Sequence, residues 1–170
     1  MVIVISGRIL AAHTYGTTGP VVCFSELSDN ALHAQLSRGF TSRGPYQPWA
    51  VVLRKDHLLA WGARPVLYLN SEEMHQTEGL PSRLRDRRVR SVPGGSPDWL
   101  HEREWRLCLD GWPDCPPTQW PGYYLGEGGV EAVIVGKSNW LAGARVGASF
   151  RGAARWLWTG SGLINDGVLG

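Results

Sequence analysis

Cysteine and long hydrophobic runs are scarce in this sequence, and each shortage excludes a class of protein. The three cysteines of the 170-residue chain have no Cys-x-x-Cys spacing, so we expect no zinc site and a reduced, cytoplasmic setting. The apolar opening, Met1 to Ile5, is short and lacks a basic leader, which predicts a first strand rather than a signal peptide or a membrane span. The net charge of +2 does not require a nucleic-acid partner.

The motifs that anchor common nucleotide and hydrolase folds are also missing. No glycine-rich loop follows a predicted strand and opens a helix, because the Gly-Glu-Gly-Gly segment at 126–129 precedes a strand instead. This arrangement disfavours a Rossmann or P-loop fold. The sequence has no Gly-x-Ser-x-Gly nucleophile elbow, so it gives no support for a hydrolase with a serine triad.

The residues that are abundant indicate one globular domain rich in sheet. Hydrophobic residues make up 43% of the chain, and nine tryptophans and 22 glycines favour broad aromatic packing and many turns. Short apolar runs alternate with short helical patterns, which predicts an α+β fold with a mixed, largely antiparallel sheet and short flanking helices. We expect this domain to cover residues 1–158, and residues 159–170 to form a flexible C-terminal tail.

The expected elements are short and are separated by loops rich in glycine and proline. Strands are predicted over 1–5, 20–24, 49–53, 65–69, 103–109 and 130–135. Helices are predicted over 29–38 with Ser28 as the N-cap, over 56–61 with Gly62 as the stop, and as pieces of 72–90 broken at 79–81. Loops are predicted over 40–48, 92–97 and 111–122.

The predicted strand at 103–109 carries the most informative pattern of charged side chains. Because side chains alternate along a strand, Glu104 and Arg106 share one face and Trp105 lies on the other. Glu102 falls on the side of Glu104 if the extended conformation begins early enough. Paired carboxylates can stabilise a developing oxocarbenium ion, as in glycosyl and ADP-ribosyl transfer. The alternative is a structural ion pair of Glu104 and Arg106 on a half-exposed sheet.

Two further groups of polar residues allow more than one interpretation. Ser25, next to Glu26, stands at the end of a predicted strand, where it either presents a hydroxyl to a site or caps a turn. Five arginines within eight residues either form a solvated helix face or contact the phosphates of nucleic acid. These arginines are Arg83, Arg85, Arg87, Arg88 and Arg90.

Four segments occur along the chain in a fixed order: Val-Cys-Phe-Ser-Glu at 22–26, Trp-Ala-Val-Val-Leu at 49–53, Gly-Ala-Arg-Pro-Val-Leu-Tyr at 62–68 and Asp-Trp-Leu-His-Glu-Arg-Glu-Trp-Arg at 98–106. In this order they resemble small bacterial proteins of the AbiGi type, which are linked with abortive phage infection. The resemblance covers roughly residues 20 to 136. The same order of elements is similar, more distantly, to the DarT-like branch of the ADP-ribosyltransferase fold.

The ADP-ribosyltransferase resemblance implies that NAD is a substrate and gives roles to individual residues. Glu104 matches a glutamate on a late strand that binds the nicotinamide ribose and stabilises the oxocarbenium ion, with Glu102 as its paired carboxylate. Tyr68 ends the apolar strand and would line the pocket. We also expect Arg8, His13, Ser25 and Arg106 to contact the cofactor.

The chain departs from the family at its N-terminus. Members usually begin with a His-Phe/Tyr-Thr segment that contacts the NAD ribose, whereas the first histidine here is His13. Either the start of the chain is missing or the activity has been lost, with Arg8 as the candidate substitute. We therefore expect either an NAD-dependent ADP-ribosyltransferase-like protein of a phage-defence or toxin–antitoxin system, or a non-catalytic binding protein that contacts nucleic acid or protein. Neither expectation involves a membrane.

Overall fold

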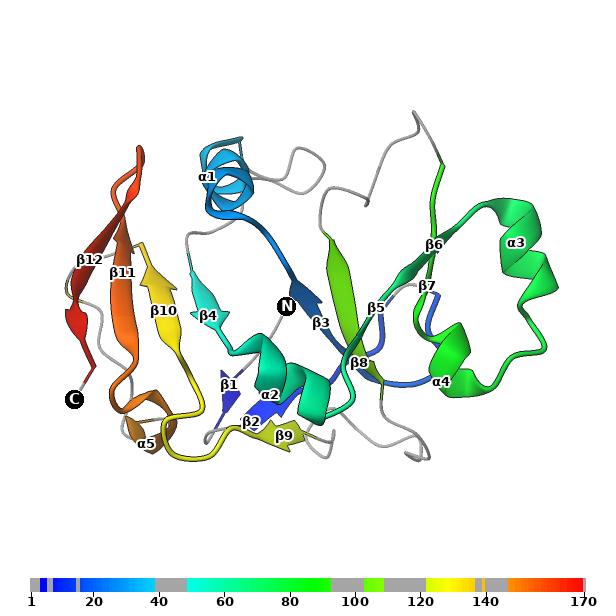
Figure 1. Cartoon of the computed structure of the whole chain (residues 1–170), viewed down its shortest axis with the longest axis horizontal. Helices are drawn as coiled ribbons and strands as arrows, with labels where there is room; N and C mark the ends of the chain where they lie inside the picture. The colour runs from blue at the N-terminus through cyan, green and yellow to red at the C-terminus, as the bar shows by residue number, and fades with distance from the viewer. Residues whose placement is uncertain are drawn as a thin grey trace. The chain divides into compact units, whose positions relative to one another are not determined.

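The structure is a computed structural model, and it describes residues 4–5, 8–14, 16–38, 49–92, 103–108, 122–136, 139 and 147–169. Short helices occur with largely antiparallel sheets, which confirms the predicted α+β class (Figure 1). The chain divides into two compact units. Unit 1 comprises Met1–Ile3, Ile9–Glu26 and Leu58–Tyr123, and unit 2 comprises Val4–Arg8, Leu27–His57 and Tyr124–Gly170.

The elements within the described residues are short. The strands are β1 (Val4–Ile5), β2 (Arg8–Leu10), β3 (Val21–Ser25), β4 (Ala50–Val52), β5 (Arg64–Pro65), β6 (Leu67–Leu69), β7 (Arg88–Arg90), β8 (Glu104–Cys108), β9 (Gly122–Tyr124), β10 (Ala132–Val135), β11 (Ala154–Trp158) and β12 (Leu163–Val168). The helices are α1 (Asp29–Arg38), α2 (Lys55–Ala60), α3 (Ser71–Gln76), α4 (Ser82–Arg85) and α5 (Gly147–Phe150).

Unit 1 is built on an antiparallel sheet with the order β3-β8-β5, in which β8 is the central strand. On one face, Val22 pairs with Leu107, and Phe24 and Pro65 flank Trp105 from either side. Val22 and Leu107 are 2% and 1% exposed, so this face reaches the core. The strands β6 and β7 form a separate parallel pair, and α3 and α4 connect them (Figure 1).

Unit 2 contains a four-stranded sheet with the order β12-β11-β10-β4 (Figure 1). The strand β10 pairs in parallel with β11 and antiparallel with β4, and all four of its residues are buried. The edge strand β12 pairs antiparallel with β11, and Arg155 on β11 forms an ion pair with Asp166 on β12 at 2.6 Å.

Local sequence explains where the helices begin and end. Ser28 Oγ accepts a hydrogen bond from the backbone three residues on, which confirms it as the N-cap of α1. Asn70 and Glu73 form a capping box at α3, because Asn70 Oδ1 accepts from the Glu73 backbone at 3.0 Å and Glu73 Oε2 accepts from the Asn70 backbone at 2.8 Å. Gly62 ends α2 with a φ of +95°, a left-handed conformation that favours glycine.

Three predicted elements differ from the structure. The predicted strand at 65–69 is divided at Val66, whose N–H donates to the carbonyl oxygen of Glu104 at 3.0 Å. The segment 72–90, predicted to be helical in pieces, ends in strand β7. The segment 159–170, predicted to be a tail, contains β12, which is held by its pairing with β11.

Other predictions concern parts of the chain that the structure covers only partly. Most of the predicted loops at 40–48, 92–97 and 111–122, together with residues 1–3 of the first strand, lies outside the described residues. The strands β2, β9 and β11 were not predicted. They are short or contain charged and aromatic residues without a clear alternating pattern, so their pairing with other strands decides their structure.

Candidate functional site

The alternation predicted for the central strand is confirmed. On β8, Arg106 Nε donates to Glu104 Oε1 at 2.8 Å, and Arg106 Nη2 lies 3.5 Å from Glu104 Oε2. Trp105 lies on the opposite face, and its indole Nε1 donates to Glu26 Oε2 at 2.8 Å. The strand therefore presents one charged face and one aromatic face.

The ion pair is buried, whereas the sequence predicts a half-exposed face. Glu104 and Arg106 are only 8% and 4% exposed. Burial alone would lower the pKa of Arg106, but the hydrogen bond and the negative charge of Glu104 raise it above its ordinary value. Removing either partner would leave an unpaired charge away from water, which is strongly unfavourable. Each charge therefore depends on the other.

Arg106 also holds, by hydrogen bonds, the backbone segment that covers the Glu104–Arg106 ion pair. Its Nη1 donates to the carbonyl oxygens of Asp86 and Arg88, at 2.8 and 3.3 Å, in the turn between α4 and β7. The Asp86 carboxylate in turn accepts from Thr18 N at 2.6 Å, from Thr18 Oγ1 at 2.8 Å and from Gly19 N at 3.0 Å. Arg106 and Asp86 thus connect three segments of unit 1 that are far apart in the sequence.

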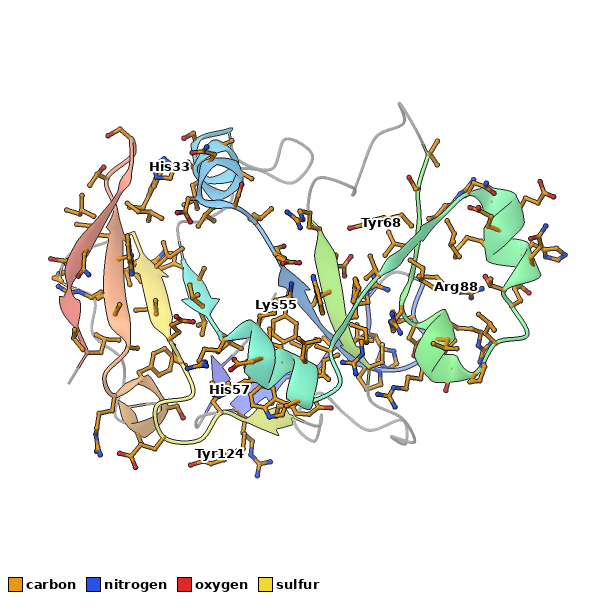
Figure 2. All side chains as sticks on the ribbon, viewed as in Figure 1. His33, Lys55, His57, Tyr68, Arg88 and Tyr124 are labelled. Atoms are coloured by element: carbon orange, nitrogen blue, oxygen red, sulfur yellow. The ribbon has the colours of Figure 1, made fainter. Side chains whose placement is uncertain are left out.

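Arg88, predicted to contact nucleic acid, is instead turned inward. It is 9% exposed and donates to the carbonyl oxygen of Met74 at 2.8 Å, to Thr77 Oγ1 at 2.9 Å and to the carbonyl oxygen of Arg85 at 3.2 Å (Figure 2). These acceptors lie at the C-terminal ends of α3 and α4, where carbonyl groups lack helical partners. The side chain of Arg88 therefore stabilises two helix ends.

Three of the predicted cofactor contacts lie beside Glu104. Tyr68 on β6 points toward β8 (Figure 2), and its hydroxyl oxygen accepts a hydrogen bond from the backbone N of Glu104 at 3.0 Å. Ser25 pairs with Glu104 in the register of β3 and β8, which puts both side chains on the same face of the sheet. Arg106 is the ion-pair partner. The structure thus brings together four residues of the predicted NAD site.

The remaining predicted residues of that site are Arg8, His13 and Glu102. His13 is exposed in unit 1, and Arg8 is exposed in unit 2. Glu102 lies outside the described residues. Arg103 has a φ of +45°, so the extended conformation of β8 does not include it.

Cys23 shares the buried face with the ion pair. It pairs with Arg106 in the register of β3 and β8. Burial, the charge of Glu104 and a side-chain hydrogen bond to Glu104 together raise the pKa of Cys23 to about 12, although the positive charge of Arg106 acts in the opposite direction. Because the thiolate is the nucleophilic form, Cys23 is inert at neutral pH. Glu104 is thus surrounded by side chains of the chain itself.

A second cluster consists of Arg64, Arg83 and Arg87, which we call the arginine surface. All three guanidinium groups rest on the backbone segment 59–65. Arg64 Nη1 donates to two carbonyl oxygens of this segment at 2.7 and 3.1 Å, and Arg87 donates to a third at 2.9 and 3.3 Å. Arg83 Nη2 stands 3.0 Å from the position that a Cβ at Gly62 would occupy. Three positively charged side chains therefore lie against the backbone segment 59–65.

The charges of the arginine surface are close enough to affect one another. Arg64 and Arg83 are exposed, and Arg87 is half-buried. Burial lowers the pKa of Arg87, and the positive charges of Arg64 and Arg83 lower it further. Of the other predicted nucleic-acid contacts, Arg90 is exposed on β7 and Arg85 is half-buried on α4.

The backbone segment 59–65 also carries one member of an aromatic pair. Trp61 belongs to the same backbone segment, and its ring stacks on that of Tyr123 with centroids 5.6 Å apart and planes inclined by 22°. Both residues are half-buried. Sequence analysis did not single out Arg64 or Trp61. The available signal was the Trp-Gly-Ala-Arg run, because a glycine stop after a helix lets neighbouring side chains approach the backbone closely.

Comparison of the chain with protein-family models, with curated proteins and with solved structures finds no match. The family resemblance therefore stays a prediction. Within the described ranges, no group of three or more His, Cys, Asp or Glu side chains is arranged to hold a metal ion. In the same part of the chain, no helix has the length and apolar character needed to cross a membrane.

Proposed function

We propose that this chain is a non-catalytic binding protein, an antitoxin or a phage-resistance partner, that holds an anionic partner on the arginine surface. One observation carries the proposal: Arg64, Arg83 and Arg87 gather on a single turn of backbone. An anion that lies close to several guanidinium groups is attracted by each of their positive charges. Arginine forks also match the planar oxygen groups of phosphates and carboxylates.

The net charge of the chain argues for a local contact rather than a general attraction to polyanions. With a charge of +2, the chain has no strong overall positive field. Binding of an anionic partner then depends on the few arginines that touch it. Changing one exposed arginine of the arginine surface should therefore weaken the binding.

The geometry around Glu104 supports a structural role for this carboxylate. It is 8% exposed, and its side chain bonds Arg106 and Cys23. A carboxylate that stabilises an oxocarbenium ion must instead reach the ribose of its substrate. We therefore attribute the charged face of β8 to stability and the function of unit 1 to the arginine surface.

A charge reversal tests the proposed function. Single-stranded DNA, RNA and poly-glutamate, each labelled with fluorescein, are titrated with the wild type, with Arg83→Glu and with the matched control Arg90→Glu at low salt. Both arginines are exposed and belong to the same run, but only Arg83 is part of the arginine surface. We expect Arg83→Glu to lose binding that Arg90→Glu retains. Equal binding by both variants, or no binding by the wild type, would overturn the proposal.

A second candidate, the NAD-dependent ADP-ribosyltransferase of the sequence-based prediction, is favoured by one observation. Ser25, Tyr68 and Arg106, all expected to contact NAD, lie beside Glu104. In that case Glu104→Gln should lower the release of nicotinamide from NAD by about 10²–10³-fold, because one preorganised electrostatic contact is lost. The matched control is Glu78→Gln, an exposed residue of unit 1. No release by the wild type, with cell lysate present as acceptor, would exclude this candidate.

A further inference from the structure

We propose that the arginine surface binds the phosphates of single-stranded nucleic acid and that a base of the strand stacks against the Trp61–Tyr123 pair. This inference rests on the proposed function and names its ligand. Three guanidinium groups lie against the backbone segment 59–65, and the same segment carries Trp61, whose ring stacks on Tyr123. A nucleotide offers a phosphate to the arginines and a base to the rings.

The arginines are held in position before any ligand arrives. The carbonyl oxygens of segment 59–65 accept from Arg64 and Arg87 at distances from 2.7 to 3.3 Å, which fixes the orientation of both guanidinium groups. A fixed side chain loses little rotamer freedom on binding, so more of the interaction energy appears as affinity. The arrangement therefore suits recognition of a small charged group by several donors at once.

The third arginine approaches the segment because residue 62 is glycine. Arg83 Nη2 lies 3.0 Å from the position of an absent Cβ, a distance tighter than ordinary van der Waals contact. The φ of +95° at Gly62 likewise disfavours any residue with a side chain. Gly62 thus permits both the turn and the close approach of the Arg83 guanidinium group.

The aromatic pair favours nucleic acid over an acidic protein segment. Trp61 is the direct neighbour of Gly62, and its ring is stacked on Tyr123 rather than set edge-on. Acidic peptides offer carboxylates to the arginines but no planar ring to the stacked pair. Nucleotides offer both a phosphate and a base, and base–aromatic stacking does not depend on the sequence of the strand.

A single strand fits better than a duplex. In a duplex the bases are already stacked on one another, so a base must first be extruded, at a cost in free energy, before it meets an aromatic ring. The small net charge of +2 also indicates a short contact rather than a long basic groove. We therefore expect a footprint of about three phosphates, one for each arginine of the surface.

The test compares strands that differ only in their bases. A labelled oligothymidylate of about 12 nucleotides, an abasic strand with the same phosphates, and poly-glutamate are each titrated with the full chain and followed by fluorescence anisotropy. For the wild type, the abasic strand should bind about tenfold more weakly than oligothymidylate, because base–aromatic stacking is lost. This comparison uses only the wild type, so no effect of a substitution on folding can influence it.

Two variants test the residues themselves. Arg83→Gln should weaken the binding of oligothymidylate about tenfold, because a hydrogen bond to a charged group is lost, while Arg90→Gln should change it by less than about twofold. Trp61→Leu should weaken oligothymidylate and leave the abasic strand unchanged. Circular dichroism checks that each variant is folded.

The outcomes separate this inference from the proposed function. If the abasic strand and poly-glutamate bind as tightly as oligothymidylate while Arg83→Gln weakens all three, the arginine surface binds anions in general and the inference is overturned alone. If Arg83→Gln binds oligothymidylate as the wild type does, both proposals fail. Preference for the strand with bases, lost in Trp61→Leu, supports the inference.

Discussion

Loss of one partner from the Glu104–Arg106 pair should destabilise unit 1 by several kcal/mol. Glu104→Gln keeps the shape of the side chain but leaves the guanidinium of Arg106 unpaired at a site where the residue is 4% exposed. Breaking a buried pair in this way costs about 3–5 kcal/mol. Because Arg106 keeps its two backbone acceptors, the carbonyl oxygens of Asp86 and Arg88, we expect the lower end of this range.

Arg106→Gln should cost more than Glu104→Gln. It leaves the carboxylate of Glu104 unpaired, and it also removes the hydrogen bonds to the carbonyl oxygens of Asp86 and Arg88. Each of these bonds contributes about 1 kcal/mol, so the difference between the two variants should be about 1–2 kcal/mol. The double variant should cost less than the sum of the single variants, because no unpaired charge remains.

Urea unfolding, followed by circular dichroism and tryptophan fluorescence, measures these differences. The control is Arg54→Gln, which breaks the ion pair with Asp56, whose side chains are 58% and 59% exposed. Exposed pairs contribute little to stability, so this variant should unfold like the wild type. A midpoint for Glu104→Gln equal to that of Arg54→Gln would refute the structural role of the buried pair.

Three further predictions concern the same unit. Iodoacetamide at pH 8 should leave Cys23 unmodified in the folded chain and modify it in urea, as read by mass spectrometry. The pKa of Cys23 is raised from 9.0 to about 12, so the stability contributed by its neutral thiol is complete below pH 9 and is lost as the pH rises toward 12. Cys23→Ala should remove this pH dependence. Asp86→Asn should lower stability by about 1–3 kcal/mol in urea unfolding, because an amide cannot accept all three hydrogen bonds from residues 18 and 19. Gly62→Ala should destabilise the folded chain by about 1 kcal/mol or more, because alanine is strained at the positive φ of residue 62. It should also weaken oligonucleotide binding, because the added Cβ meets the Arg83 side chain. Unchanged binding in fluorescence anisotropy would contradict this prediction.

The face assignments on β8 could be read from the sequence, but the burial of that face could not. A period of two fixes that Glu104 and Arg106 lie on one side and Trp105 on the other. What covers the charged side is the turn between α4 and β7, about 20 residues earlier in the chain, which Arg106 itself holds through backbone carbonyl oxygens. A tertiary contact of this kind leaves no periodic signal.

The arginine run shows why local patterns mislead. Arginine is a good helix former, so a helix was the natural expectation for the whole run. The parallel pairing of β6 with β7 overrides this preference and turns Arg88 inward, where it bonds the ends of two helices. The same topology puts Arg83 and Arg87 beside Arg64, a residue of β5 that no linear pattern connects with them.

The salt dependence of oligothymidylate binding tests the central claim most directly. The logarithm of the binding constant is measured against the logarithm of the salt concentration for the wild type, Arg83→Gln and Arg90→Gln. Three phosphate contacts to a single strand predict a slope of about −2, because each contact contributes about −0.7. Arg83→Gln should reduce this slope by about 0.7, and Arg90→Gln should leave it unchanged. A slope near zero, or an equal slope for all three proteins, would contradict the assignment of function to the arginine surface.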